Sequence, residues 1–119
     1  MMARELSQAH VRDFLQGTGV DAWGVFGTDG RVFEYELPGV LYPETLSTLC
    51  AAAYGAASVA AEELKRSGPE ALEVDLGSRN LILLRVSVDM IAFALVSEEV
   101  TASELARRWQ RFRSDSVDS

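Results

Sequence analysis

Residues 43–66 shape this chain more than any other segment, and they read Pro43-Glu44-Thr45-Leu46-Ser47-Thr48-Leu49-Cys50-Ala51-Ala52-Ala53-Tyr54-Gly55-Ala56-Ala57-Ser58-Val59-Ala60-Ala61-Glu62-Glu63-Leu64-Lys65-Arg66. Apolar residues recur at three- and four-residue steps, which predicts a long helix. Its predicted inward face consists of Leu46, Leu49, Cys50, Ala53, Ala57, Ala60, Ala61 and Leu64. Pro43 suits the first turn of a helix, and Ser67-Gly68-Pro69 ends it.

A second row of small residues follows the other side of this helix, where a surface helix usually carries charge. Thr48, Ala52, Gly55 and Val59 are spaced four, three and four residues apart. A helix that is apolar or small on nearly all sides usually has two neighbours. Gly55 costs about 1 kcal/mol relative to alanine in a helix interior, a cost that the close approach of another backbone would explain. We therefore expect one side on this chain's own sheet and the other against a second copy, a partner, or both.

Two alternatives stay open at this helix. A helix rich in alanine has high intrinsic helix propensity, and it can simply carry that alanine on a solvent face. Tyr54 lies at the margin of the second row. It is either an amphipathic aromatic that anchors an interface or part of the chain's own core.

The remaining elements follow from hydrophobic periodicity and turn residues. Residues 3–16 read as a helix that Gly17 and Gly19 stop. Residues 22–28 and 31–37 read as strands joined by Asp29-Gly30, a dipeptide typical of two-residue hairpin turns.

Three more strands and a helix complete the chain. Residues 72–76 alternate between apolar and polar, as do 31–37, whereas the strands at 22–28, 81–86 and 90–96 are apolar on both faces. Alternating strands belong at sheet edges and doubly apolar strands in the middle. The last helix opens on the capping box Thr101-Ala102-Ser103-Glu104, and residues 114–119 read as a polar, frayed tail.

Composition indicates a folded protein with an acidic body. Of its 119 residues, 48% are hydrophobic and 24% charged, with a formal net charge of −7. That size fits a single domain over residues 1–119 with a core over 3–113. An acidic body argues against nucleic-acid binding, which needs a basic surface. The sequence contains no long apolar run and no signal peptide, so we expect no membrane span and a cytoplasmic location.

The element order resembles that of a known family. It reads helix, two strands in a hairpin, long Ala-rich helix, three strands, helix. With the run Leu-Ser-Thr-Leu-Cys-Ala-Ala-Ala-Tyr-Gly-Ala-Ala at 46–57 and a Thr28-Asp29-Gly30-Arg31 hairpin, the chain resembles the Roadblock (dynein light chain) family. It is similar in particular to the small prokaryotic MglB-type partners of Ras-like GTPases. The resemblance covers residues 3–113 and rests on small-residue patterning and element order, with no catalytic signature.

This resemblance implies an α+β fold: a five-stranded antiparallel sheet with the long helix on one face and the two terminal helices on the other. It also implies a homodimer whose long helices lie side by side and whose third strands pair, forming a platform that docks a small Ras-like GTPase. The predicted interface residues are Thr48, Ala51, Ala52, Tyr54, Gly55, Val59, Glu62, Leu72, Val74 and Leu76. Unlike some MglB-type chains, this sequence ends soon after its final helix, so a function that needs a carboxyl-terminal extension is not expected.

The sequence shows no motif for catalysis, nucleotide binding or metal binding by the chain itself. There is no Gly-x-x-x-x-Gly-Lys-Ser/Thr loop, and no His/Cys/carboxylate cluster has metal-ligand spacing. Cys50 falls on the apolar stripe and reads as a buried structural thiol. We therefore expect a non-enzymatic GTPase regulator without a cofactor. The alternatives are a profilin- or PAS-like small-ligand sensor and a purely structural light-chain-like subunit of a larger assembly.

Overall fold

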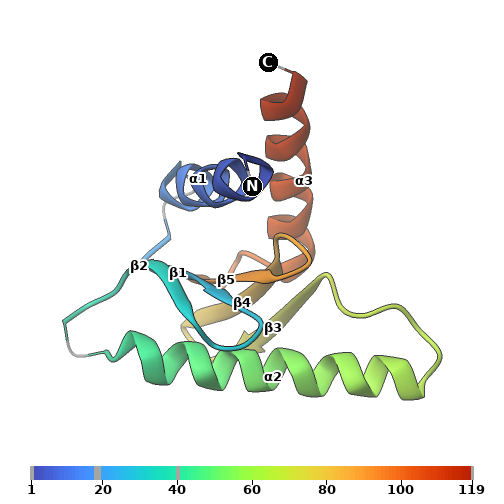
Figure 1. Cartoon of the computed structure of the whole chain (residues 1–119). Helices are drawn as coiled ribbons and strands as arrows, with labels where there is room; N and C mark the ends of the chain where they lie inside the picture. Colours follow the sequence, from blue (N-terminus) through green and yellow to red (C-terminus); the bar gives the residue numbers. More distant parts are fainter. Residues whose placement is uncertain (1, 18–19, 40, 119) are drawn as a thin grey trace.

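The computed structural model describes residues 2–17, 20–39 and 41–118, and it places three helices and five strands in them (Figure 1). The expected order of elements is confirmed, and the elements are α1 (Met2–Gly17), β1 (Ala22–Gly27), β2 (Val32–Glu36), α2 (Pro43–Glu63), β3 (Ala71–Asp75), β4 (Arg79–Arg85), β5 (Met90–Ser97) and α3 (Ala102–Asp118).

All five strands form one antiparallel sheet in the order β2-β1-β5-β4-β3. The three strands that are apolar on both faces are β1, β5 and β4, and they occupy the middle. The two alternating strands, β2 and β3, are the edges. Both placements were expected, because a central strand has protein on each face and an edge strand does not.

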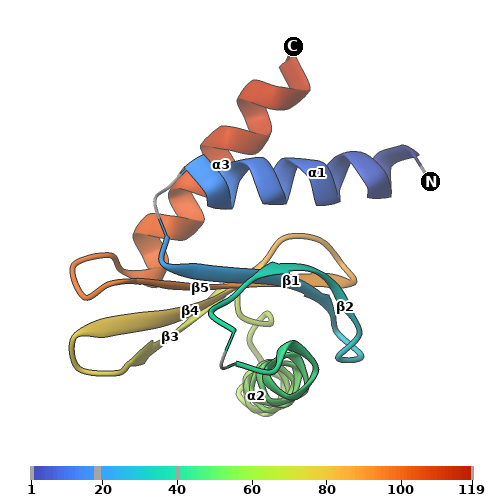
Figure 2. The same cartoon turned by 90° about the vertical axis from the view of Figure 1, so that its left-hand side faces the viewer.

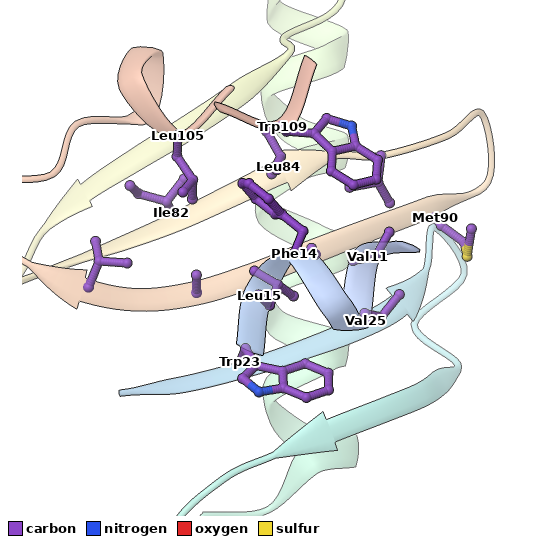
Figure 3. Close-up of a cluster of buried hydrophobic side chains, with 14 residues drawn as sticks. Val11, Phe14, Leu15, Trp23, Val25, Ile82, Leu84, Met90, Leu105 and Trp109 are labelled. Carbon is purple, nitrogen blue, oxygen red and sulfur yellow. The ribbon is translucent and has the colours of Figure 1, made fainter. Parts of the chain in front are cut away.

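Helices cover the two faces of the sheet unequally. Figure 2 shows α1 and α3 crossing one face while α2 lies alone on the other, the layering that the family resemblance implies. On the α1/α3 side, a large cluster joins Val11, Phe14, Trp23, Ile82 and Trp109, among other side chains (Figure 3). On the α2 side, a smaller cluster joins Phe26, Cys50, Tyr54, Leu83, Ile91 and Phe93.

Two glycines allow the close packing and the tight turn next to α2. Gly24 pairs with Phe93 across the β1–β5 ladder. A Cβ at Gly24 would overlap the ring of Phe93, so glycine leaves the space that this ring occupies. Gly30 has φ +91°, a conformation that residues with a Cβ rarely adopt.

The β1–β2 connection differs from the expected two-residue turn. Gly30 N–H donates to Gly27 O (2.9 Å) and Gly27 N–H donates to Arg31 O (2.7 Å), so three residues lie between the paired positions. Asp29 accepts the Arg31 N–H through its side chain (3.0 Å). This arrangement is the three-residue hairpin, in which a type I turn precedes one left-handed residue. Gly30 supplies the positive φ here as the third loop residue rather than the second of two.

The carboxyl end of α2 comes earlier than the sequence indicates. The helix ends at Glu63, not Arg66, with Leu64 as its cap. Lys65 has φ 59°, while its N–H donates to Glu62 O and the Arg66 N–H donates to Ala61 O. These two bonds form a Schellman motif, whose left-handed position is usually glycine.

The carboxyl-terminal helix is longer than expected. It continues through Ser114 to Asp118, so the frayed tail predicted for residues 114–119 is wrong for all but residue 119, which lies outside the described residues. At its start, Thr101 Oγ1 accepts the Glu104 N–H (3.1 Å), which is half of the predicted capping box. A carboxylate from strand β3 also caps this helix, because Ala102 N–H donates to Glu73 Oε1 (2.7 Å).

We predict that Lys65→Gly is more stable than Lys65→Ala by about 1 kcal/mol in the free energy of unfolding. The left-handed conformation costs an L-residue roughly 1–2 kcal/mol, and glycine removes most of that cost. Both variants lose the same charge near the helix end, so their difference isolates the backbone term. Urea unfolding followed by circular dichroism measures it, and equal midpoints would contradict the assignment.

Candidate partner-binding surface

Three residues on α2 define the side that packs on the sheet. Ser47, Cys50 and Tyr54 are buried, at steps of three and four residues. Half-buried residues extend the same side, and they are Leu46, Ala51, Ala57, Ser58 and Ala61. The inward face therefore includes polar side chains that hydrophobicity alone does not select, and the two that are buried are Ser47 and Tyr54.

Hydrogen bonds to backbone carbonyls explain why these polar residues point inward. Ser47 Oγ is within hydrogen-bond distance of Gly30 O in the β1–β2 loop (2.7 Å) and of Glu44 O (3.1 Å). Tyr54 Oη donates to Pro69 O (2.6 Å) in the connection that precedes β3. Together these bonds attach α2 to segments on both sides of it in the sequence. Sequence reasoning missed Ser47, although its spacing from Cys50 and Tyr54 was a usable signal.

The helix is consequently rotated away from the predicted apolar stripe. Leu49 is 62% exposed and Leu64 72% exposed, and Ala53 and Ala60 are exposed too. These four residues were expected in the core, and that expectation is wrong. With alanine around most of the helix, apolar burial favours no single rotation, and the bonds of Ser47 and Tyr54 select one.

Tyr54 is part of the chain's own core, which is one of the two roles that the sequence leaves open. Its side chain is only 8% exposed and packs with Phe26 and Phe93. Burial raises the pKa of its hydroxyl, and the nearby Arg85 partly opposes that rise. Tyr54 therefore belongs to the core of its own chain and is not available to a partner. Ala51 is half-buried against the same cluster and lies at the edge of the surface, not within it.

The opposite side of α2 forms an exposed surface without charge. We call it the outer α2 face, and it consists of Thr45, Thr48, Leu49, Ala52, Ala53, Gly55, Ala56, Val59 and Ala60. Val59 is 60% exposed, and Gly55 has no atom within 4 Å of the position where a Cβ would stand. The predicted second row is thus exposed in the single chain, and the predicted residue Glu62 is exposed just beyond it.

Strand β3 adds an open sheet edge to this surface. It pairs with β4 on one side only within the described chain, so the backbone groups of its outer edge have no strand beside them. Leu72 packs on the α2-side cluster, which places Val74 and Leu76 on that side as well. Val74 is 43% exposed and Leu76 55% exposed. An apolar, unpaired edge of this kind is a template for pairing with another chain.

Two kinds of feature, a metal-binding cluster and a membrane-spanning helix, are absent from the described residues. These residues contain no group of three or more His, Cys, Asp or Glu side chains that could hold a metal ion. Among them, no helix combines the length and the apolar character needed to cross a lipid bilayer. The outer α2 face and the β3 edge present mainly small or apolar side chains and, at the strand edge, backbone hydrogen-bonding groups.

Comparison with known proteins identifies the fold. No protein-family model and no curated protein sequence matches the chain. Among solved structures, Myxococcus xanthus MglB superimposes with a TM-score of 0.74 at 8% identity, covering 89% of this chain and 87% of that one. A structure described as MglB with tetrameric arrangement gives 0.72 at 16% identity, with 93% and 85% covered. A Roadblock/LC7 domain from Streptomyces avermitilis gives 0.70 at 14% identity, with 88% and 92% covered.

The chain therefore has the Roadblock-type fold of MglB, as the element order predicts. Profilin from Schizosaccharomyces pombe shares the general arrangement at a lower TM-score of 0.61, with 18% identity and 93% and 96% of the two chains covered. At these identities the likeness concerns the fold.

Cys50 is expected to be nearly unreactive toward thiol reagents in the folded protein. Burial raises the pKa of its thiol from 9.0 to about 11, so little thiolate is present at pH 8. The contribution of this group to folding stability is complete below pH 9 and is lost as the pH rises through about 11. Labelling with a chromogenic disulfide at pH 8, with and without denaturant, measures the accessibility. Equally fast labelling of both samples would contradict a buried thiol.

Proposed function

We propose that this chain is a non-catalytic, cytoplasmic homodimeric regulator that binds a small Ras-like GTPase and changes its GTPase cycle, most directly as an activating partner. One observation carries the proposal. A helix that anchors the fold leaves a charge-free outer face exposed, on the same side of the sheet as an unpaired apolar strand edge. The MglB-like fold supports the choice of partner class.

The dimer in this proposal uses both parts of the surface. Small side chains at Ala52 and Gly55 allow two α2 helices to approach closely, and Leu49 and Val59 supply apolar contact area. Two copies of an edge strand can pair antiparallel about a two-fold axis, which satisfies the backbone groups of both. Isologous pairing of this kind closes on itself and leaves no further β3 edge.

The action on the GTPase needs no nucleophile from this chain. A regulator that holds one switch conformation of the GTPase orients the partner's own catalytic groups through shape and polar contacts. The paired helices would form the docking platform. Glu62 and its neighbours at the margin of the outer α2 face would supply the polar contacts. The sequence itself has no phosphate-binding loop for a nucleotide, so the nucleotide belongs to the partner.

Packing under α2 argues against the small-ligand sensor. Phe26, Leu83, Ile91 and Phe93 fill the space between helix and sheet, and each is at most 4% exposed. A ligand there would have to displace a packed core. The structural light-chain role differs from the proposed one only in its effect on GTP hydrolysis, so an assay of hydrolysis separates them.

We expect the purified chain to bind a small Ras-like GTPase from its own cell in a nucleotide-dependent manner. Each candidate GTPase is loaded with GDP or a non-hydrolysable GTP analogue and tested by biolayer interferometry, with hydrolysis measured in parallel. Binding with faster hydrolysis supports an activator, and binding without a change in hydrolysis supports the structural role. If no GTPase of the cell binds in either nucleotide state, the proposed function is wrong.

We expect Val59→Glu to weaken self-association at least tenfold, because it places an unpaired carboxylate in a dehydrated contact. Val88→Glu is the matched control, since Val88 is exposed on the β4–β5 turn, outside α2 and β3. Gly55→Leu should act like Val59→Glu by blocking close approach, while its open surroundings in the single chain leave the fold intact. Analytical ultracentrifugation at low concentration measures all three variants. Unchanged dimers in Val59→Glu and Gly55→Leu would rule out the outer α2 face as the contact.

A further inference from the structure

The second edge of the sheet, strand β2, is open as well. Among the described strands it pairs only with β1, and it lies at the opposite edge from β3. No backbone hydrogen bond between the described residues joins its outer side to another segment. Pairing of two β3 strands in a dimer would leave this edge open in both subunits. The backbone groups of an open edge can accept an extended segment as an added strand.

The two glutamates of β2 lie on the α1/α3 side of the sheet. Glu36 pairs with Trp23 of β1, and Trp23 belongs to the α1/α3-side cluster. Glu34 lies two residues earlier and therefore on the same side, where Arg12 forms an ion pair with it (3.6 Å) and Gln8 Nε2 donates to it (3.3 Å). The Glu34 carboxylate is thus occupied by α1. Glu36 is exposed and has no ion pair among the described residues.

Tyr35 points to the other side of the same strand. It pairs with Gly24, against which the Phe93 ring packs, and Phe93 belongs to the α2-side cluster. Leu37, two residues further along, packs on that cluster and is half-buried. Tyr35 itself is 51% exposed, so its ring is available to a neighbour at the strand edge. The β2 edge therefore presents a carboxylate on one side of the sheet and an aromatic ring on the other.

A cavity of about 290 Å³ lies next to Glu36 on the α1/α3 side. It is lined from the end of α1, from β1 with the two residues before it, and from the end of β2, by Leu15, Gln16, Val20, Asp21, Trp23 and Glu36. Figure 3 shows Trp23 on β1, with β2 beside it as the outermost strand.

The charge of this cavity favours a single cation. None of its lining residues is basic, and Asp21 is already paired with Arg79 of β4. Glu36 is therefore the lining carboxylate without an ion pair, and the carboxyl end of α1 adds partial negative charge beside it. A Lys or Arg side chain matches this arrangement, because its aliphatic stem can lie along the apolar lining while its charged head meets Glu36.

We propose that the outer edge of β2 binds an extended basic segment of a partner protein as an added strand. The segment alternates between basic and apolar residues, because side chains of an added strand point alternately to the two sides of the sheet. A Lys or Arg beside Glu36 extends into the cavity, and the apolar residue next to it packs on Tyr35. Charge complementarity selects this occupant, since the chain has a formal charge of −7 and Glu36 lacks a cation. The β2 edge is separate from the outer α2 face and the β3 edge, so this interaction does not depend on the proposed function.

The test is a two-dimensional ¹H–¹⁵N NMR titration of the full chain with synthetic peptides at constant ionic strength. In the first peptide lysine alternates with valine, in the second all lysines precede all valines, and in the third glutamate replaces lysine. We expect the first peptide to shift the backbone amide signals of residues 33–36 with saturation, and to bind about fivefold more tightly than the second, because only alternation suits an added strand. Equal binding of the first two peptides, saturable shifts in β3 instead of β2, or no saturable shift would overturn the proposal.

Charge exchange at Glu36 separates the β2 edge from general attraction to an acidic chain. Glu36→Gln should weaken binding of the alternating lysine peptide about threefold, the effect of one partly exposed ion pair. Glu36→Lys should reverse the preference, so that the glutamate peptide binds more tightly than the lysine peptide. Glu63→Gln is the matched control, since Glu63 is exposed at the end of α2 and does not line the cavity.

Two further measurements keep the result specific to this edge. Urea unfolding verifies that each variant is folded, and analytical ultracentrifugation verifies that self-association is unchanged, so a failure here is distinct from a failure of the proposed dimer. Equal weakening by Glu63→Gln, or an unreversed peptide preference in folded Glu36→Lys, would overturn the assignment.

Discussion

Two hydrogen bonds from α2 to distant backbone carbonyls determine what this protein presents to its surroundings. Ser47 reaches Gly30 in the first hairpin and Tyr54 reaches Pro69 before β3. Each bond contributes only about 1 kcal/mol, yet leaving a buried hydroxyl unpaired costs roughly 1–3 kcal/mol. The two hydroxyls therefore fix one rotation of an otherwise uniform helix. That rotation turns Leu49 and Val59 outward, and the outer α2 face exists because of it.

Most of the architecture could be predicted from hydrophobic patterning. Strands that are buried on two faces have a different sequence pattern from strands that are buried on one, so the central and edge positions of β1, β5, β4, β2 and β3 followed directly. The element order was enough to indicate the Roadblock-type fold, although identity to solved structures of that fold is at most 16% for the MglB and Roadblock/LC7 chains compared above. The placement of apolar and small residues along the chain determines the fold. This placement can be kept while almost all of the individual side chains are replaced.

The features that the sequence did not predict share a physical cause. The rotation of α2, the end of α2 at Glu63 and the three-residue hairpin all depend on hydrogen bonds between backbone groups and partners whose positions only the folded chain defines. Lys65 adopts a left-handed conformation because two carbonyls of the last helical turn need hydrogen-bond donors. This conformation costs free energy because the residue is not glycine. Exposure of the outer α2 face could be anticipated from Thr48, Ala52, Gly55 and Val59, whereas the core role of Tyr54 could not.

The cap that Glu73 provides for α3 gives the edge strand a second attachment. Glu73 belongs to β3, and its carboxylate accepts the first free N–H of α3 through the sheet's other face. One edge strand thus touches both layers of the molecule: its outer backbone is open to another chain, while one of its side chains holds the start of a terminal helix. A displacement of β3 that broke this cap would cost about 1 kcal/mol at α3. The strand whose outer edge is open to another chain therefore also holds the first turn of α3 through one side chain.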